Sequence, residues 1–137
     1  MPALITMPFT AIHTPGVSMP AGAPASMATR TATPHLLHIS GQPPRDAEGQ
    51  TVCVGDIVGQ TEQVIARIRQ IAEDQGGSLA DVCRLRVYYT RREDLPAIMQ
   101  VRLRHFQAPY PAVSAALVGL YNPEWLLEIE ATVALPA

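Results

Sequence analysis

Two glutamates near the end of the sequence are the side chains best placed for acid–base chemistry. Glu128 and Glu130 lie two positions apart within Leu126–Ala134, a run typical of a β-strand, so their carboxylates leave the same face. If that face lines a cleft, one carboxyl with a raised pKa can act as a general acid or base. The alternatives are a solvated charged stripe or cross-strand pairing with Arg84 and Arg86, and spacing alone favours these structural interpretations.

Other reactive side chains indicate no second kind of chemistry. His35 and His38 are three positions apart in an expected strand and point to opposite faces, which is unsuitable for shared metal ligation. Ser114 has no adjacent His or Asp that would make it a nucleophile. Cys53 and Cys83 lack Cys-x-x-Cys spacing, and we expect both to be buried, reduced thiols. The sequence therefore predicts neither a metal site nor a cofactor.

The clearest element that could position the glutamates is a helix over 57–74. Asp56 is a suitable N-cap, because its carboxylate can accept backbone N–H groups of the first turn. Gly76 and Gly77 provide a stop. Side chains suited to one buried face recur between them at helical spacing: Ile57, Thr61, Val64, Ile65, Ile68, Ile71 and Ala72.

Strands and a second helix are expected around this helix. Alternation across Cys83–Thr90 predicts a strand with one apolar face. A second helix follows Asp94, which we expect to cap it, and ends before Pro109. The other expected strands are His35–Ser40, Thr51–Val54, Ala112–Leu120 and Leu126–Ala134. This order predicts an α/β (α+β) fold, a two-layer sandwich in which one mixed sheet is backed by two helices.

Residues 1–34 form a compositionally distinct segment ahead of a domain at 35–137. Six prolines fall there, at positions 2, 8, 15, 20, 24 and 34, which favours an extended N-terminal arm over a helix. We expect a tail over 1–20 and a packed arm over 21–34. Such an arm could cover a pocket or a neighbouring subunit.

The overall composition limits the classes of partner. A chain of 137 residues with 47% apolar residues is typical of one globular domain. The net charge of −2 and the few aromatic residues disfavour nucleic-acid binding, although arginines between positions 84 and 104 leave a local basic patch open. No apolar run reaches membrane-spanning length, and no secretory signal is evident. We expect a cytoplasmic protein with a small-molecule ligand and no membrane partner.

Several short motifs together resemble the Rid (reactive intermediate deaminase, YjgF-type) family. They are Ser40-Gly41-Gln42, Gly55-Asp56 ahead of Gln60–Ile65, Val87–Thr90, and Glu128-Ile129-Glu130-Ala131. No single motif is specific, but their order and spacing over 35–134 are. The resemblance implies a chorismate-mutase-like sandwich that assembles as a homotrimer and binds enamines and imines in clefts between subunits.

The same resemblance assigns site residues. In deaminating members, an arginine in a Pro-Ala-Arg-Ser segment pairs bidentately with a substrate carboxylate, and Val113 stands at that position here. The backbone of Gly41 and Ala115 would help to hold the substrate. Glu128 would lie near the attacking water as the catalytic residue, while Glu130 would be structural.

Three departures from the family pattern affect the expected substrate. Val113 cannot form the charge-assisted fork to a carboxylate, so a neutral or apolar group is expected beside it. The family's Pro-Tyr ahead of the first strand has no match, and Met27 stands near that place. Arg102 occupies a position in the second helix that is often tyrosine. It could swing in as a substrate-binding cation, but an ordinary exposed helix arginine is the favoured interpretation.

These departures indicate a divergent Rid-like enzyme. It would act on an enamine, imine or related reactive carbonyl small molecule, with Glu128 and a bound water in an intersubunit cleft, and not as a standard 2-iminoacid deaminase. The alternative is a non-catalytic trimeric small-molecule-binding or interaction protein, from which a ligand would be recovered intact. Endoribonuclease activity, attributed to some relatives, is disfavoured by the near-neutral charge.

Overall fold

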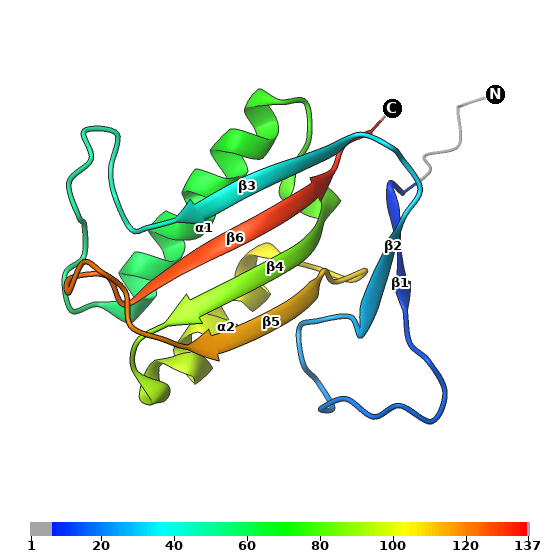
Figure 1. The fold of residues 1–137 in the computed structure, drawn as a ribbon, viewed down its shortest axis with the longest axis horizontal. Helices are drawn as coiled ribbons and strands as arrows, with labels where there is room; N and C mark the ends of the chain where they lie inside the picture. Colours follow the sequence, from blue (N-terminus) through cyan, green and yellow to red (C-terminus); the bar gives the residue numbers. More distant parts are fainter. Residues whose placement is uncertain (1–6, 137) are drawn as a thin grey trace.

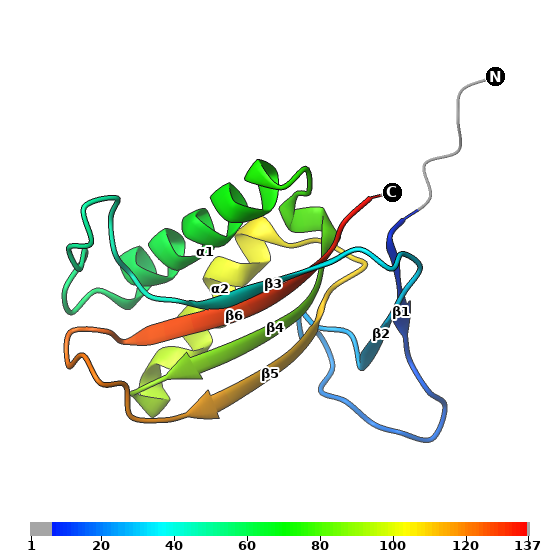
Figure 2. The same ribbon diagram turned by 45° about the horizontal axis from the view of Figure 1, so that its top comes forward.

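A four-stranded sheet with two helices on one face forms the body of the chain (Figures 1 and 2). The computed structural model describes residues 7–136. The strand order is β3 (Leu36–Gln42), β6 (Leu127–Ala134), β4 (Val82–Tyr89) and β5 (Ala112–Leu117). Strand β6 is antiparallel to both neighbours, whereas β4 and β5 are parallel, so the predicted mixed sheet is confirmed.

The helices form where the sequence predicts them. Helix α1 spans Ile57–Asp74, and the Asp56 carboxylate accepts a hydrogen bond from the Gly59 backbone N–H at 3.1 Å. Helix α2 spans Leu95–His105, and short 3-10 turns at Leu79–Asp81 and Arg92–Asp94 precede β4 and α2. The Asp94 carboxylate does not cap α2 as expected. It binds the Arg91 guanidinium at 2.7 and 3.0 Å, because that cation lies within the same turn.

The core lies between the helices and one face of the sheet. Alternation places Leu85, Val87 and Tyr89 of β4 in this core, as predicted, where they contact Val64, Ile65 and Ile68 of α1 among others. Within residues 7–136, no helix has the length and apolarity needed to span a lipid bilayer.

The predicted strand at Thr51–Val54 is wrong. The segment is a loop in which Thr51 forms one isolated bridge with Arg45, since no longer strand lies beside it to complete a ladder. Cys53 adopts a positive φ of 52° and is exposed, so only Cys83 is the buried thiol we expected. Strand β5 also ends at Leu117, three residues earlier than predicted.

A stack of side chains holds this loop at the end of the sheet where β3 ends and β6 begins. The Arg45 guanidinium lies 4.5 Å from the ring centroid of Trp125, and the Tyr121 ring meets Trp125 edge-on at 4.8 Å. Trp125 is 2% exposed and donates its indole N–H to the Thr51 hydroxyl at 3.2 Å.

The N-terminal segment forms a hairpin at the opposite end of the sheet (Figure 1). Strands β1 (Phe9–Ile12) and β2 (Ala28–Thr31) pair antiparallel, so the tail expected over 1–20 is wrong for its middle part, and residues 1–6 lie outside the described residues. The hairpin is anchored because Phe9 is 1% exposed and packs against Cys83 and Ala134. The loop between β1 and β2 also reaches β5, where the Ser26 backbone N–H donates to the Pro111 carbonyl at 2.9 Å.

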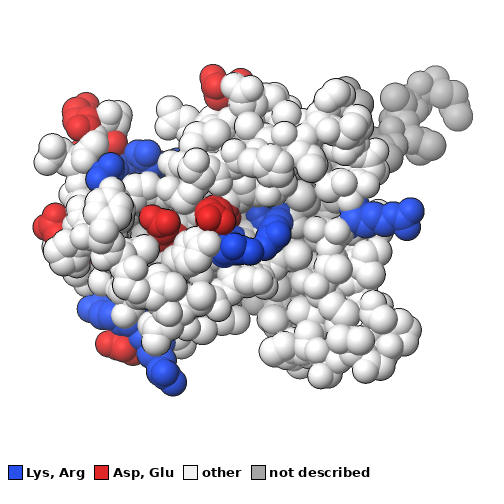
Figure 3. All heavy atoms as spheres, viewed as in Figure 1, with Lys and Arg blue, Asp and Glu red and all other residues white. Residues whose placement is uncertain are grey.

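The other face of the four-stranded sheet carries polar side chains and no described helix covers it (Figure 2). We call this the open face. Acidic and basic groups lie side by side over the middle of the sheet on this side (Figure 3). Its members from the two central strands are Arg84, Arg86 and Tyr88 of β4, and Glu128, Glu130 and Thr132 of β6.

Candidate functional site

Gly41 and Glu128 lie against each other on adjacent strands. Strands β3 and β6 pair with an irregularity between Ile39 and Gln42, which brings the Gly41 backbone up to the Glu128 side chain. A Cβ atom built on Gly41 would lie only 2.5 Å from Oε1 of Glu128. The absence of a side chain at Gly41 therefore allows the carboxylate to occupy this place.

The surroundings of Glu128 favour its protonated form. Partial burial raises the pKa of the Glu128 carboxyl, and the negative charge of Glu130 raises it further. Oε1 of Glu130 is 3.2 Å from the Tyr88 hydroxyl, which in turn is 3.5 Å from Nη1 of Arg86. A half-buried carboxyl with a raised pKa is a stronger base once ionised, and can exchange a proton with a bound water.

The two central strands place arginines beside these acids without forming ion pairs. Arg86 lies opposite Glu130 in the register, so the predicted cross-strand neighbourhood exists. The ion pairs of the described residues do not include this pair; they join Arg91 to Asp94, and Arg104 and His105 to Glu62. The Tyr88 hydroxyl lies between the two groups instead.

Val113 and Ala115 lie away from Gly41 and Glu128 within one chain. Glu128 is opposite Tyr88, and Tyr88 is opposite Ala116 on β5. Val113 is thus two strand spacings and three residues from Glu128, roughly 14 Å between Cα atoms. Val113 pairs with Leu85 and packs partly against the core, while Ala115 is exposed on the edge strand.

Val113 borders a hollow of its own beside the N-terminal hairpin. This cavity of about 330 Å³ is lined by Met27, Ala28, Thr29, Arg84, Ala112, Val113 and Ser114. Met27 is therefore near Val113 in space, although the two residues are far apart in the sequence.

Arg102 is neither exposed nor free, so the favoured interpretation from sequence is wrong. Its side chain is 3% exposed and Nη2 donates to the Pro24 carbonyl at 3.0 Å, because the loop between β1 and β2 covers it. Burial lowers the pKa of the Arg102 guanidinium to about 10, and its Nε has no partner within the described residues. Recruitment of Arg102 to a substrate would require this loop to move away.

Arg84 and Arg86 are the neighbours of Glu128 and Glu130 to which sequence reasoning gave no binding role. The sequence offered them only as cross-strand partners of the glutamates, and spacing alone could not give the register that sets Arg86 opposite Glu130. Within residues 7–136, no cluster of three His, Cys, Asp or Glu side chains suits a metal ion.

Comparisons with known proteins decide the family. A family model described as Endoribonuclease L-PSP matches residues 18–135. The chain is 36% identical over 116 residues to the 3-aminoacrylate deaminase RutC of Acinetobacter baylyi, covering 82% of this chain and 92% of that protein. It also resembles YyfB of Yersinia pestis, described as a conserved Rid family protein of unknown function, with a TM-score of 0.85 and 32% identity over 94% of this chain and 100% of that one. The chain belongs to the Rid (YjgF-type) family.

A further Rid structure agrees with this assignment. RidA of a Psychrobacter species superposes with a TM-score of 0.67 and 30% identity, covering 90% of this chain and 98% of that one. The fold and family predicted from the short motifs are confirmed, and a deaminase-like activity on imines or enamines is consistent with the family.

Proposed function

We propose that this Rid protein hydrolyses an enamine or imine of a small molecule, with Glu128 as the general base. The observation that carries the proposal is the apposition of Gly41 and Glu128, in which a half-buried carboxyl with a raised pKa lies beside the Gly41 backbone. The 36% identity to a protein named 3-aminoacrylate deaminase supports the same reaction type.

The reaction follows from the chemistry of these groups. An enamine first tautomerises to its imine, which is the electrophile. Glu128 takes a proton from water as the water oxygen bonds to the imine carbon, and returns that proton to the nitrogen of the carbinolamine. The carbinolamine hydroxyl then loses its proton, the nitrogen gains one, and the carbon–nitrogen bond breaks, giving a carbonyl compound and ammonia. Consumption of one water balances the reaction.

A second copy of the chain would complete the site. Ala115 and its neighbours on β5 are exposed, and the open face of the sheet has no described cover, so both surfaces are available to another subunit. In a homotrimer, Val113 and Ala115 of one subunit would approach Gly41 and Glu128 of the next. The separation of Val113 and Glu128, roughly 14 Å within one chain, is the reason for requiring this assembly.

Val113 should give this enzyme a substrate preference that differs from that of the deaminating Rid proteins. An aliphatic side chain cannot bind a carboxylate at that position, so we propose slow turnover of 2-iminoacids held in the usual way. A non-catalytic trimeric binding protein is the alternative, and recovery of an unconsumed ligand from the purified protein would favour it.

Replacing the base tests the proposal. Ammonia release is measured with freshly generated 3-aminoacrylate and 2-aminoacrylate for the wild type, E128Q and the control E124Q, whose side chain is exposed in the preceding loop. We expect E128Q to lower kcat on the order of 10²–10⁴-fold and E124Q to leave it unchanged. Equal turnover by E128Q and the wild type would refute the mechanism, and a monomer in sedimentation equilibrium would refute the shared cleft.

A further inference from the structure

The proposed site needs a cation if its substrate is an acid, and the two obvious candidates do not supply one. Val113 is uncharged, and Arg102 is buried and bound to the Pro24 carbonyl. The open face that carries Glu128 holds two other arginines, Arg84 and Arg86, on the neighbouring strand β4.

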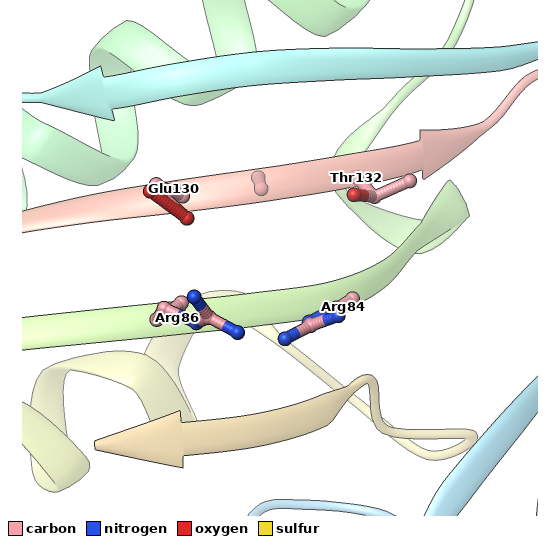
Figure 4. A pocket seen from close by; sticks show the side chains of 5 residues that line it. Arg84, Arg86, Glu130 and Thr132 are labelled. Atoms are coloured by element: carbon pink, nitrogen blue, oxygen red, sulfur yellow. The ribbon is translucent and has the colours of Figure 1, made fainter. Parts of the chain in front are cut away.

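These two arginines converge on a small cavity. Figure 4 shows their side chains extending toward each other along β4, with Glu130 and Thr132 on the β6 side. The cavity measures about 150 Å³ and is lined by Arg84, Arg86, Glu130, Ala131 and Thr132. This volume suits a carboxylate-sized anion with a short carbon chain.

Glu130 lies opposite Arg86 and lines the same cavity, but no ion pair of the described residues joins it to either arginine. Arg86 contacts the Tyr88 hydroxyl, Glu130 contacts the same hydroxyl, and the ion pairs of the described residues include neither Arg84 nor Arg86. Two guanidinium groups that approach each other repel unless an anion or water lies between them. Their planar donor groups match the two oxygens of a carboxylate.

The spacing along the strands relates this cavity to Glu128. Arg86 is two residues from Tyr88, and Tyr88 is opposite Glu128. The arginine and the proposed base are therefore about 7 Å apart along the strands and one strand spacing apart across them, roughly 8 Å between Cα atoms. A carboxylate bound at Arg86 would direct a short chain toward a water held by Glu128. Arg84 is two residues further along and could contact the carboxylate without reaching the base.

We propose that Arg86, assisted by Arg84, binds the carboxylate of an acidic substrate and so replaces the cation that Val113 removes. This inference rests on the proposed function. In 2-aminoacrylate the amine is on the carbon next to the carboxylate. The separation of Arg86 and Glu128 favours a short amino-acrylate whose amine-bearing carbon lies at least one bond further away. The substrate class is therefore a β-amino-acrylate or a longer homologue.

Binding of an unreactive acid tests the arginine pair without any turnover. Propionate and its neutral analogue propionamide are titrated calorimetrically into the wild type, R86Q, R84Q, R86K and the control R92Q, which removes an exposed arginine from the turn before α2. We expect propionate to bind more tightly than propionamide, and R86Q to weaken it roughly tenfold or more. R86K should weaken it less because it keeps the charge, and R92Q should match the wild type. Equal propionate affinity in R86Q and R92Q, or equal affinity for the acid and the amide, would overturn the proposal.

Kinetics with 3-aminoacrylate separate this inference from the proposed function. R86Q should raise KM with little change in kcat, whereas E128Q should lower kcat. A normal KM in R86Q together with an inactive E128Q would overturn the arginine assignment and leave Glu128 as the base. If the wild type releases no ammonia, the proposed function fails and the propionate titration still decides whether Arg84 and Arg86 bind a carboxylate. Melting temperatures of all variants confirm folding, and R86K replaces R86Q in the comparison if R86Q unfolds.

Discussion

A single methyl group at Gly41 should reduce activity strongly while leaving the fold intact. In G41A the new Cβ would lie 2.5 Å from Oε1 and 3.0 Å from Cδ of Glu128, whereas ordinary contact begins near 3.4 Å. The carboxylate must therefore move by about 0.9 Å to relieve the overlap. A displacement of about 1 Å at a reacting group costs on the order of 10²-fold in rate.

The effect of G41A on stability should be small because the clashing atoms end a flexible side chain. Gly41 has no positive φ, so alanine can adopt its backbone conformation, and the lower entropy of the unfolded chain partly offsets the overlap. We expect the free energy of unfolding to change by less than about 1 kcal/mol. Urea denaturation followed by circular dichroism measures this change.

The assay compares kcat for ammonia release in G41A, the control G119A, E128A and the double variant G41A/E128A. Gly119 has open space where its Cβ would be, so G119A should match the wild type. In the E128A background the added methyl group has nothing to displace, so G41A should cause little further loss. Wild-type activity in G41A, or an equal extra loss in the E128A background, would refute the geometry assigned to Glu128.

Three further variants test the electrostatics and packing. Burial and, to a smaller extent, the Glu130 charge raise the pKa of Glu128, and E130Q removes the second cause. The acid limb of the kcat/KM profile should therefore move to lower pH, because the base must be ionised to act, and an unmoved limb would contradict the coupling. R102M removes a buried charge, whose burial costs on the order of 3 kcal/mol, and also removes the hydrogen bond from that side chain to Pro24. These two effects offset each other, so urea denaturation should place the stability of R102M within about 1 kcal/mol of the wild type. A loss above about 2 kcal/mol would show that the buried charge is well compensated. F9A should lower the local stability of the β1–β2 hairpin by about 3 kcal/mol. Amide exchange should then become faster in β2 while β4 and β6 stay protected. A uniform loss of protection would show that the hairpin unfolds together with the core.

Elements with strong local signals could be predicted from the sequence. The N-cap Asp56 and the helical spacing behind it place α1 at its observed bounds, and the alternation of Leu85 and Val87 identifies the buried face of β4. The run at Thr51–Val54 has a β-propensity similar to that of β4, but no strand lies beside it to pair with. The strand predicted there from β-propensity alone is therefore wrong.

Features that depend on distant contacts could not be predicted in this way. The β1–β2 hairpin was missed because the prolines suggested an extended tail, yet Pro8 precedes β1 and leaves its ladder intact. The burial of Arg102 depends on a loop that lies 78 residues earlier in the chain. The apposition of Gly41 and Glu128 came from the family motifs and not from spacing, since only the β3–β6 register brings them together.

Trp125 is the one tryptophan in the sequence, so every change in indole emission originates from the corner where Arg45, Tyr121 and Thr51 surround it. This corner adjoins the ends of β3 and β6 that carry Gly41 and Glu128. The protein thus contains an intrinsic fluorescent probe. A compound that binds near Glu128 and reorders the loop after β3 or the loop before β6 would alter the intensity or wavelength of this emission without any added label. A library of candidate substrates can be ranked by that signal alone.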